Sequence, residues 1–366
     1  MRIFHILNHV KNVGNGIVNV CVDLACVQAR HGRKVAVVSA GGGFVELLKQ
    51  HGVGHYELDQ RRNPRNLVYA LRGFSRILRD FRPDVVHAHM LTGTVLSRGL
   101  RPFFHFVLIT TLHNEFQRSA RLMGMADRVI AVSSAVKRSM VHRGIPEHKL
   151  RVVLNGTVGS PRLEHSSMDA HRHLFSPRIV TVAGMYERKG VQDLIAAFDL
   201  LSEEFPDLHV YLVGDGPDRP KFEEMAKRTL HPERIHFEGL QLYPMQYVKG
   251  ADAFVLPSHK ESFGLVICEA RNVGTPIVAT HVDGIPEALD DGRAGLLVAP
   301  RQPKQLAVAL RSVLQNPALK NELSIRSRTG IERFHVNRVY EETQAVYEEA
   351  TARGHGTSFP VKAVHM

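Results

Sequence analysis

Short apolar runs alternate with longer segments in which apolar residues recur every three or four positions. In the first 160 residues, the apolar runs that predict strands lie at 3–7, 35–39, 85–87, 107–111, 129–132 and 152–154. Examples of the helical segments between them lie at 17–30 and 67–79. From residue 178 the alternation resumes, with predicted strands and helices at 179–183, 191–201, 209–213, 220–230, 235–237, 253–256, 264–273 and 276–280. This pattern predicts an α/β protein with parallel sheets covered by helices on both faces.

The polar stretch 156–177 separates the two series and predicts a linker between two doubly wound, Rossmann-like domains. We place the first domain at 1–160 and the second at 175–336. The chain closes with a helical region from 303 to about 350 and a loose tail. Ligands of open parallel sheets bind beyond the carboxyl ends of the strands, so we expect a site in a cleft between the domains.

Composition fits a soluble globular protein of two domains. The 366 residues are 44% hydrophobic and 23% charged, and no apolar run approaches the roughly 20 residues that a membrane span needs. The apolar part of the N-terminus is too short for a signal peptide and predicts a first buried strand. The three cysteines, Cys21, Cys26 and Cys268, have no metal-binding or disulfide spacing, which favours a reduced, cytoplasmic protein.

The net charge of +11 is distributed unevenly. Residues 1–160 hold 23 Lys and Arg against 9 Asp and Glu, whereas residues 161–366 hold 24 against 27. A basic first half suits nucleic acid, an anionic membrane surface or an acidic substrate, and charge alone does not choose among them.

Two cations follow the predicted strand at 179–183. Arg188 and Lys189 lie on a strand-to-helix loop, where a guanidinium fork and an ammonium can neutralise a diphosphate. A solvated surface pair is the alternative reading of the same residues. The turn at 214–217 (GDGP) is not a dinucleotide fingerprint.

The stretch 258–271 (SHKESFGLVICEAR) follows the predicted strand at 253–256. Ser262 is a plausible N-cap for a helix beginning near Phe263, which would leave the N–H groups of Gly264 and Leu265 free for an anion. Glu261 would then lie in the loop and Glu269 well inside the helix, on either side of a ligand. An ordinary amphipathic helix remains the alternative.

Histidines follow several predicted strands of the first half. His87, His89 and His113 each come at or just after a strand, and His113 has the best position for a cleft. A single histidine is more often a packing or loop residue than a catalytic one.

Together these motifs resemble the retaining nucleotide-sugar glycosyltransferases of family 4, which have the GT-B fold. The resemblance runs over nearly the whole chain and is densest in LVGDGP (212–217), GADAFVLPS (250–258), ESFGLVICEA (261–270), GTPIVAT (274–280), DGIPEAL (283–289) and PDVVHAH (83–89). Glu261 and Glu269 match the E-x7-E motif of that family.

The resemblance implies a role for each candidate residue. It implies a catalytic group of His113, Arg188, Lys189 and Glu261, with Glu261 on hydroxyls of the donor sugar. The donor-binding residues that it implies are Gly16, Gly184, Leu240, Ser262, Phe263, Gly264, Leu265 and Glu269. Among them, Glu269 would bind the ribose, backbone near Leu240 the base, and backbone near Gly264 the diphosphate.

The resemblance also implies an acceptor-binding first domain, a donor-binding second domain, and a last helix, about 337–366, that packs back toward the first domain. Family members need no metal or other cofactor and keep the anomeric configuration by front-face attack. Two departures are visible: Gly184 stands where the family usually has an arginine, and Asn15 replaces the first glycine of a pair with Gly16. Arg188 is the candidate for the second cation.

Several readings of function stay open. The principal one is transfer of a hexose or N-acetylhexosamine to a saccharide or lipid-linked acceptor in cell-envelope polysaccharide or lipopolysaccharide synthesis. The alternatives are a sugar-nucleotide epimerase of the same fold and a basic nucleic-acid-binding protein, although no nucleic-acid motif is present. In segment 67–79, Arg72, Arg76 and Arg79 lie off the apolar stripe and suit a peripheral contact with an anionic membrane. A packed helix with a solvated basic face is the alternative reading of the same residues.

Overall fold

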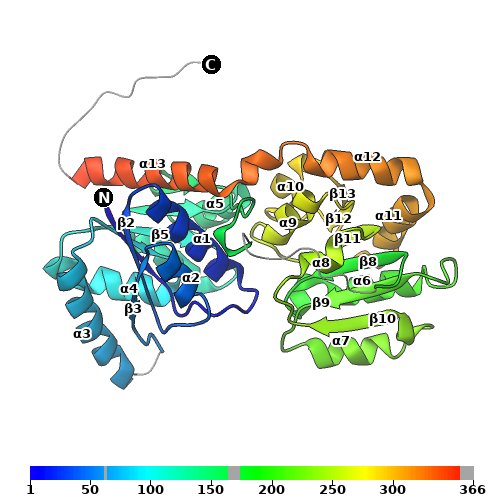
Figure 1. Cartoon of the computed structure of the whole chain (residues 1–366), viewed down its shortest axis with the longest axis horizontal. Helices are drawn as coiled ribbons and strands as arrows, with labels where there is room; N and C mark the ends of the chain where they lie inside the picture. The colour runs from blue at the N-terminus through cyan, green and yellow to red at the C-terminus, as the bar shows by residue number, and fades with distance from the viewer. Residues whose placement is uncertain (62–63, 164–173, 355–366) are drawn as a thin grey trace, which may run out of the picture.

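The computed structural model describes residues 1–61, 64–163 and 174–354, and confirms an α/β protein with two parallel sheets (Figure 1). The first sheet has the order β3-β2-β1-β4-β5-β6-β7 and the second β10-β9-β8-β11-β12-β13, and every pairing is parallel. The strands of the first sheet are β1 (Arg2–Ile6), β2 (Lys34–Ser39), β3 (Gly54–Glu57), β4 (Val85–Ala88), β5 (Val107–Leu112), β6 (Arg128–Ala131) and β7 (Leu150–Val152). Those of the second are β8 (Arg178–Val182), β9 (His209–Val213), β10 (Ile235–Gly239), β11 (Ala253–Leu256), β12 (Ile277–Thr280) and β13 (Leu296–Val298).

Helices connect the strands in both halves. In the first half they are α1 (Gly16–Arg30), α2 (Val45–Gln50), α3 (Pro64–Phe81), α4 (Leu91–Leu100) and α5 (Ser134–His142). In the second they are α6 (Val191–Asp199), α7 (Arg219–Ala226), α8 (Met245–Val248), α9 (Leu265–Val273), α10 (Ile285–Ala288), α11 (Pro303–Gln315) and α12 (Pro317–Arg328), and the last helix is α13 (Val336–Gly354). None of the helices described is long and apolar enough to cross a membrane.

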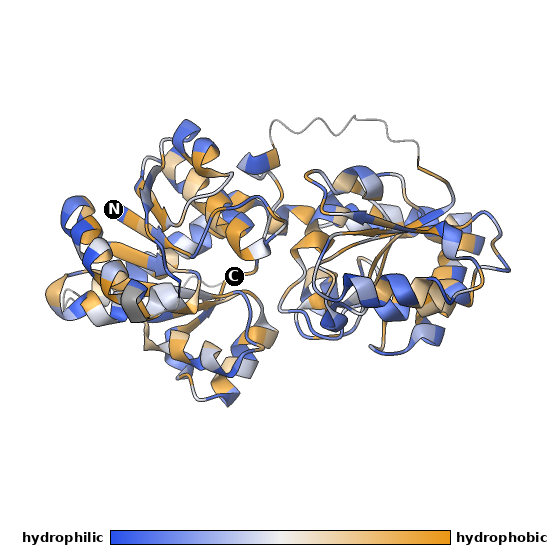
Figure 2. Cartoon of the chain, turned by 90° about the horizontal axis from the view of Figure 1, so that it is seen from below, coloured by the Kyte–Doolittle hydropathy of each residue, from blue (hydrophilic) through white to orange (hydrophobic). Residues whose placement is uncertain are grey.

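Side chains alternate between the two faces of the first sheet. Ile3 packs with α1, α2 and α13 on one face, while Phe4 and Ile6 pack with α3, α4 and α5 on the other. Both faces are therefore apolar, and the strands form the hydrophobic middle layer seen in Figure 2.

The second sheet is also covered on both faces. Leu194 of α6, Phe222 of α7 and Leu310 of α11 pack on one face of it. Ile267 of α9 and Ile285 of α10 pack on the other, in a cluster that continues into the first domain. The shared cluster joins the two halves of the molecule through apolar contacts.

The predicted helical region from 303 to about 350 is confirmed, and the structure divides it into α11, α12 and α13. Asn316 caps α12 just before Pro317, which cannot continue the preceding helix. Gly330 then takes a left-handed conformation (φ 70°) and turns the chain toward α13. Helix α13 packs on α1, β5 and β6 of the first domain, as Figure 1 shows; residues 355–366 of the predicted last helix lie outside the described part.

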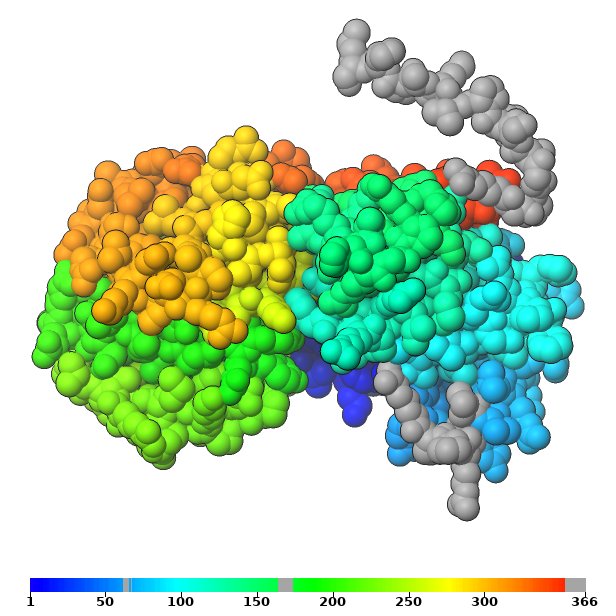
Figure 3. Space-filling view, turned by 180° about the vertical axis from the view of Figure 1, so that it is seen from behind, coloured from blue at the N-terminus to red at the C-terminus, as the bar shows by residue number. Residues whose placement is uncertain are grey.

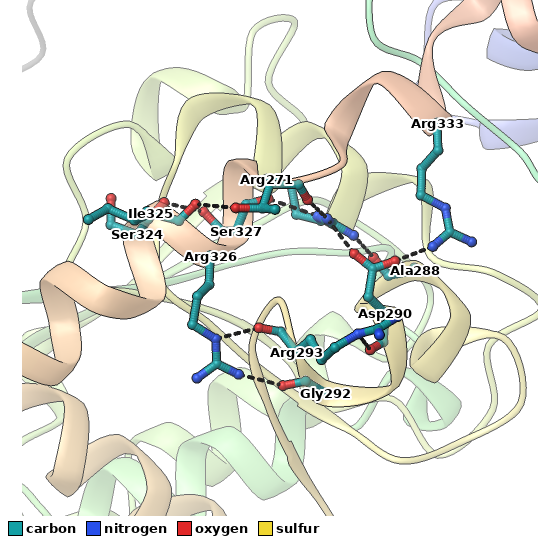
Figure 4. A network of polar contacts seen from close by, with 11 residues as sticks. Arg271, Ala288, Asp290, Gly292, Arg293, Ser324, Ile325, Arg326, Ser327 and Arg333 are labelled. Carbon is teal, nitrogen blue, oxygen red and sulfur yellow. Dashed lines mark hydrogen bonds and ion pairs between the residues drawn. The ribbon is translucent and has the colours of Figure 1, made fainter.

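Buried polar bonds hold the segment that leads to α13 (Figure 4). The guanidinium of Arg271 in α9 is fully buried and donates to the carboxylate of Asp290 (2.8 Å). It also donates to the carbonyl oxygens of Ala288 (2.7 Å), Ser327 (2.8 Å) and Thr329 (2.6 Å). Arg333 pairs with the other oxygen of Asp290. The buried charge of Arg271 is thus neutralised, and the segment that leads to α13 leaves the second domain from a fixed position.

Candidate active site

A cavity of about 600 Å³ lies between the two domains, beyond the carboxyl ends of strands of both sheets. In Figure 3 the two halves meet along one junction, where part of the N-terminal segment is visible between them. All twelve predicted site residues line this cavity: Gly16, His113, Gly184, Arg188, Lys189, Leu240, Glu261, Ser262, Phe263, Gly264, Leu265 and Glu269. Its volume is in the range of small-molecule sites.

The loop after β8 brings its cations to the end of β11. Gly190 has φ 70°, and a Cβ there would lie 1.8 Å from the carbonyl oxygen of Pro257. The backbone N–H of His259 donates to the carbonyl oxygen of Arg188 (2.8 Å). This close approach, which needs glycine, places Arg188 and Lys189 beside the loop that carries Glu261.

Lys189 and Glu261 form an ion pair in the wall of the cavity, with both side chains mostly buried. The N–H of Glu261 donates to Asp283 (2.9 Å), which fixes the backbone of the loop. The Arg188 guanidinium lies 5.5 Å from the ring of Phe116, in the first domain, and 5.4 Å from the ring of Tyr186. Arg188 is thus held by cation–π contacts, and among the described residues no carboxylate lies within ion-pair distance of its guanidinium.

The predicted N-cap at Ser262 is wrong. Helix α9 begins at Leu265, and its N-cap is Gly264 in a left-handed conformation (φ 88°) with no side-chain cap. The hydroxyl of Ser262 instead donates to Glu115 of the first domain (2.7 Å). The first N–H groups of α9 have no partner within the helix, and its N-terminus faces the cavity with partial positive charge.

Glu269 lies one turn into α9, near a buried ion pair that sequence reasoning did not find. Arg162 and Asp23 form this pair at 2.9 Å, and Ser160 also donates to Asp23 (2.7 Å). The pKa of Glu269 is raised to about 7. Burial is the main cause, the charge of Asp23 adds to it, and the charge of Arg162 opposes it. The carboxyl therefore titrates near neutral pH.

The first domain supplies the opposite wall. Asn15 caps α1 through a hydrogen bond from the N–H of Ile17 (3.0 Å). A Cβ at Gly16 would lie 3.2 Å from Leu265, so the N-termini of α1 and α9 approach each other across the cavity. His113 follows β5 and is partly buried, and burial lowers its pKa to about 3. It faces the cavity as a neutral imidazole.

Three predicted residues contribute mainly through shape. The ring of Phe263 is buried and packs against Phe334 at 5.9 Å between centroids, so it anchors the loop. A Cβ at Gly184 would lie 3.0 Å from the ring of Tyr186, which occupies the space beside this position. Leu240 is half exposed on the cavity wall.

Contacts between the domains were also missed by sequence reasoning. Ser133 donates to the carbonyl oxygen of Ser262 (2.8 Å). Glu287 accepts the N–H groups of Ser134 (3.0 Å) and Ala135 (3.1 Å) at the start of α5. The pair Ser133-Ser134 before an apolar helix signals a helix start. Nothing in the local pattern indicates that a carboxylate of the other domain would reach it.

Two parallel α/β domains with a cavity between the ends of their strands define the GT-B class. Residues 14–157 match the family model described as Glycosyltransferase Family 4, and residues 171–329 match the one described as Glycosyl transferases group 1. The chain belongs to the family 4 glycosyltransferases.

Curated relatives agree with this assignment. The chain is 30% identical over 259 residues to a glycogen synthase of Mycobacterium tuberculosis, covering 66% of this chain and 62% of that protein. It is 26% identical to LpsD, a lipopolysaccharide core biosynthesis glycosyltransferase of Rhizobium meliloti, covering 88% of this chain and 91% of the relative. The match to the glycogen synthase thus spans less than two thirds of that relative's length.

A solved structure shares the fold. Anabaena Alr3699/HepE, in complex with UDP and glucose, has a TM-score of 0.79 and 18% identity, covering 95% of this chain and all of the other. The match confirms the GT-B architecture predicted from the sequence.

Proposed function

We propose that this glycosyltransferase transfers a hexose or N-acetylhexosamine from a nucleotide-diphosphate sugar, with retention of the anomeric configuration. The observation that carries the proposal is the grouping of Arg188, Lys189 and the N-terminus of α9 on one wall of the cavity. Two cations and a helix N-terminus suit a diphosphate, whose negative charge grows as it departs. Glu261, paired with Lys189, then meets hydroxyls of the donor sugar.

The remaining roles follow the order of groups in such a donor. Glu269 accepts a hydrogen bond from the ribose, and backbone near Leu240 contacts the base. Gly16 leaves room for the α1 loop to close on the phosphates, since any side chain there would meet Leu265. His113 lies at the reacting sugar.

We propose a front-face reaction that uses no metal and no nucleophile of the protein. The acceptor hydroxyl attacks the anomeric carbon from the side of the departing diphosphate. A phosphate oxygen of the donor takes the acceptor proton, and the nucleoside diphosphate leaves with the electron pair of the broken bond. Arg188 and Lys189 stabilise the charge that collects on it.

Product analysis tests this reaction. A panel of UDP-, GDP- and ADP-sugars is first screened for thermal stabilisation, and NMR then gives the anomeric configuration of the product formed from the stabilising donor. We expect the donor's own configuration, in enzyme pretreated with EDTA as well as in untreated enzyme. An inverted product, or activity restored only by added metal, contradicts the mechanism. An epimerised nucleotide sugar would indicate the alternative enzyme class.

The acceptor that we propose is a saccharide or lipid-linked saccharide of the cell envelope, and LpsD, a relative named for lipopolysaccharide core synthesis, supports this proposal. Helix α3 supports contact of the first domain with an anionic membrane. Phe74 and Leu78 are buried on one side of it, whereas Arg72, Arg76 and Arg79 are exposed. Tyr69 is 70% exposed beside them.

Co-sedimentation with anionic vesicles tests the membrane contact. Each Lys or Arg near an anionic surface contributes about 1 kcal/mol. We therefore expect the change of Arg72, Arg76 and Arg79 to Glu to abolish binding at low salt. The matched control changes Lys221, Lys227 and Arg228 to Glu, which alters the net charge equally on exposed sites of the second domain. Equal loss in both variants, or no binding by the wild type, contradicts the proposal.

A further inference from the structure

A chain of buried histidines leads from the interior of the first domain to His113. His5 lies on β1, His87 on β4, and His89 directly after β4. All three are fully or almost fully buried between the first sheet and the helices α1 and α13. The rings of His87 and His89 stack with 4.2 Å between centroids, and His89 and His113 with 5.4 Å.

Hydrogen bonds connect Gln28 with three of these histidines in series. The side-chain oxygen Oε1 of Gln28 lies 2.7 Å from Nε2 of His5, and Nδ1 of His5 lies 2.9 Å from Nε2 of His89. Nδ1 of His89 lies 3.1 Å from Nε2 of His113. Within the described residues, only Nδ1 of His113 in this series has no hydrogen-bond partner, and His113 lines the cavity.

The amide of Gln28 gives the series a direction. Its NH2 group donates to the hydroxyl of Tyr347 (3.4 Å), so its oxygen faces His5 and requires Nε2 of His5 to carry a proton. A neutral His5 then accepts at Nδ1 from Nε2–H of His89, and a neutral His89 accepts at Nδ1 from Nε2–H of His113.

Burial keeps these rings neutral. It lowers the pKa of His5 to about 4 and that of His113 to about 3, and burial together with the neighbouring histidines lowers the pKa of His89. Each neutral ring has one donor and one acceptor, so the proton position on His5 determines that on the next two rings.

We propose that Gln28, His5 and His89 are positioning residues that hold His113 as its Nε2–H tautomer. The Nδ1 lone pair is then available to accept a hydrogen bond from a hydroxyl of the donor sugar. The use of that lone pair rests on the proposed function, whereas the tautomer is a property of the free protein. No sequence motif indicates this arrangement, because the four residues come from four separate segments.

The same histidines have ring nitrogens close enough together to suggest a metal site, since ligand atoms of His5, His87 and His89 lie within 4.8 Å of one another. Hydrogen bonds to other side chains already occupy all of these nitrogens. In His87, Nδ1 faces the Tyr347 hydroxyl and Nε2 the Thr111 hydroxyl, both at 2.6 Å. A metal would have to break several of these bonds, so the chain explains the geometry better.

NMR of protein labelled with ¹⁵N in histidine tests the proposal directly. Long-range ¹H–¹⁵N spectra distinguish protonated from unprotonated ring nitrogens, and the signals of His113 are those lost in His113→Asn. At neutral pH, without ligand, we expect protonated Nε2 and unprotonated Nδ1 for His113. Protonation at Nδ1, averaging between tautomers, or stoichiometric zinc binding that shifts the His5 and His89 signals would overturn the proposal.

Variants test the role of the hydrogen-bonded series from Gln28 to His113. His89→Phe leaves Nε2 of His113 without its acceptor, so the ring should average between tautomers. The matched control is His87→Phe, an equally buried neighbour outside the series, which should leave the His113 spectrum unchanged. Gln28→Leu removes the distant anchor and should also give averaged His113 signals, so the test remains available if His89→Phe does not fold. Equal effects of His87→Phe and His89→Phe would contradict the proposal.

Enzyme assays separate this inference from the proposed function. If both hold, His89→Phe lowers kcat/KM for sugar transfer about tenfold, the value of one hydrogen bond. Binding of the nucleotide without its sugar should remain unchanged. A single His113 tautomer in a protein that binds no nucleotide sugar would support the histidine series and contradict the proposed function. Nucleotide-sugar transfer by a protein whose His113 averages between tautomers would support the proposed function and contradict the histidine series.

Discussion

Glu269 lies inside helix α9, and burial raises the pKa of its carboxyl from the ordinary value of 4.5 to about 7. The folded protein therefore binds the proton more tightly than the unfolded chain between these values, so stability falls as pH rises from 4.5 to 7. Glu269→Gln removes the titration. We expect the variant to be more stable than the wild type by about 3 kcal/mol at pH 8 and by less than about 1 kcal/mol at pH 5.

Thermal unfolding without ligand measures this difference. The melting temperature of the wild type should fall from pH 5 to pH 8 relative to that of Glu269→Gln. Glu322→Gln, on an exposed face of α12, is the control and should keep the same difference from wild type at both pH values. A melting-temperature difference for Glu269→Gln that does not change with pH would show that the carboxyl is already ionised at low pH.

Single residues were predictable where a motif carried them. Glu261, Lys189 and Arg188 follow strands, and their chemistry is visible from residue type and position. Asp23 and Arg162 were not predictable, since they are 139 positions apart and come together only when α1 packs on the segment after β7. Long-range pairing of buried charges has no local pattern.

At the scale of elements, the loop from β8 to α6 depends on Gly190. In Gly190→Ala the new Cβ would clash with Pro257, and the left-handed conformation adds about 1–2 kcal/mol of strain. We expect a lower melting temperature and loss of nucleotide binding, because Arg188 and Lys189 would move.

Gly32→Ala is the matched control for this change. Gly32 has nearly the same conformation (φ 73°) but nothing within 4 Å of the added Cβ, so it should show the strain alone and bind nucleotide as the wild type does. Equal nucleotide affinity for Gly190→Ala and Gly32→Ala, measured by calorimetry, would contradict the role of the loop.

Most elements were predictable from periodicity, and the exceptions have physical reasons. Strand β3 (GHYE) is a short edge strand with no buried residue, so it lacks an apolar signal. β7 lies two positions before its predicted range of 152–154. The start of α9 was predicted two residues early because Ser262 has the composition of an N-cap, whereas its hydroxyl is used by Glu115 across the cleft. Tertiary contacts decided these boundaries.

At the scale of the whole molecule, polar contacts hold the two domains around the cavity. Glu287 accepts two N–H groups of α5, and hydrogen bonds to a charged group contribute about 1.5–3 kcal/mol each. We expect Glu287→Ala to loosen the closed arrangement and to increase the radius of gyration measured by small-angle X-ray scattering. The control is Glu322→Ala, which removes an exposed carboxylate of the same domain. An unchanged radius in both variants would mean that the other contacts between the domains hold them together without Glu287.

The fold class and the two-domain arrangement followed from the alternation of strands and helices, while the contacts between domains did not. Alternation reports what each segment buries within its own sheet. The bonds of Ser133, Ser262 and Glu287 depend on how the finished domains meet, which local periodicity does not record.

The central claim is that the cavity binds a nucleoside diphosphate through Lys189. Calorimetric titration with UDP, GDP and ADP tests it most directly, using the wild type, Lys189→Met and, as a control, Lys260→Met, which changes an exposed lysine next to Glu261. We predict that at least one nucleotide binds wild type and Lys260→Met equally. It should bind Lys189→Met more weakly by about 1.5–3 kcal/mol, the value of a hydrogen bond to a charged group. Binding of none of the three, or equal binding to Lys189→Met and wild type, would contradict the account.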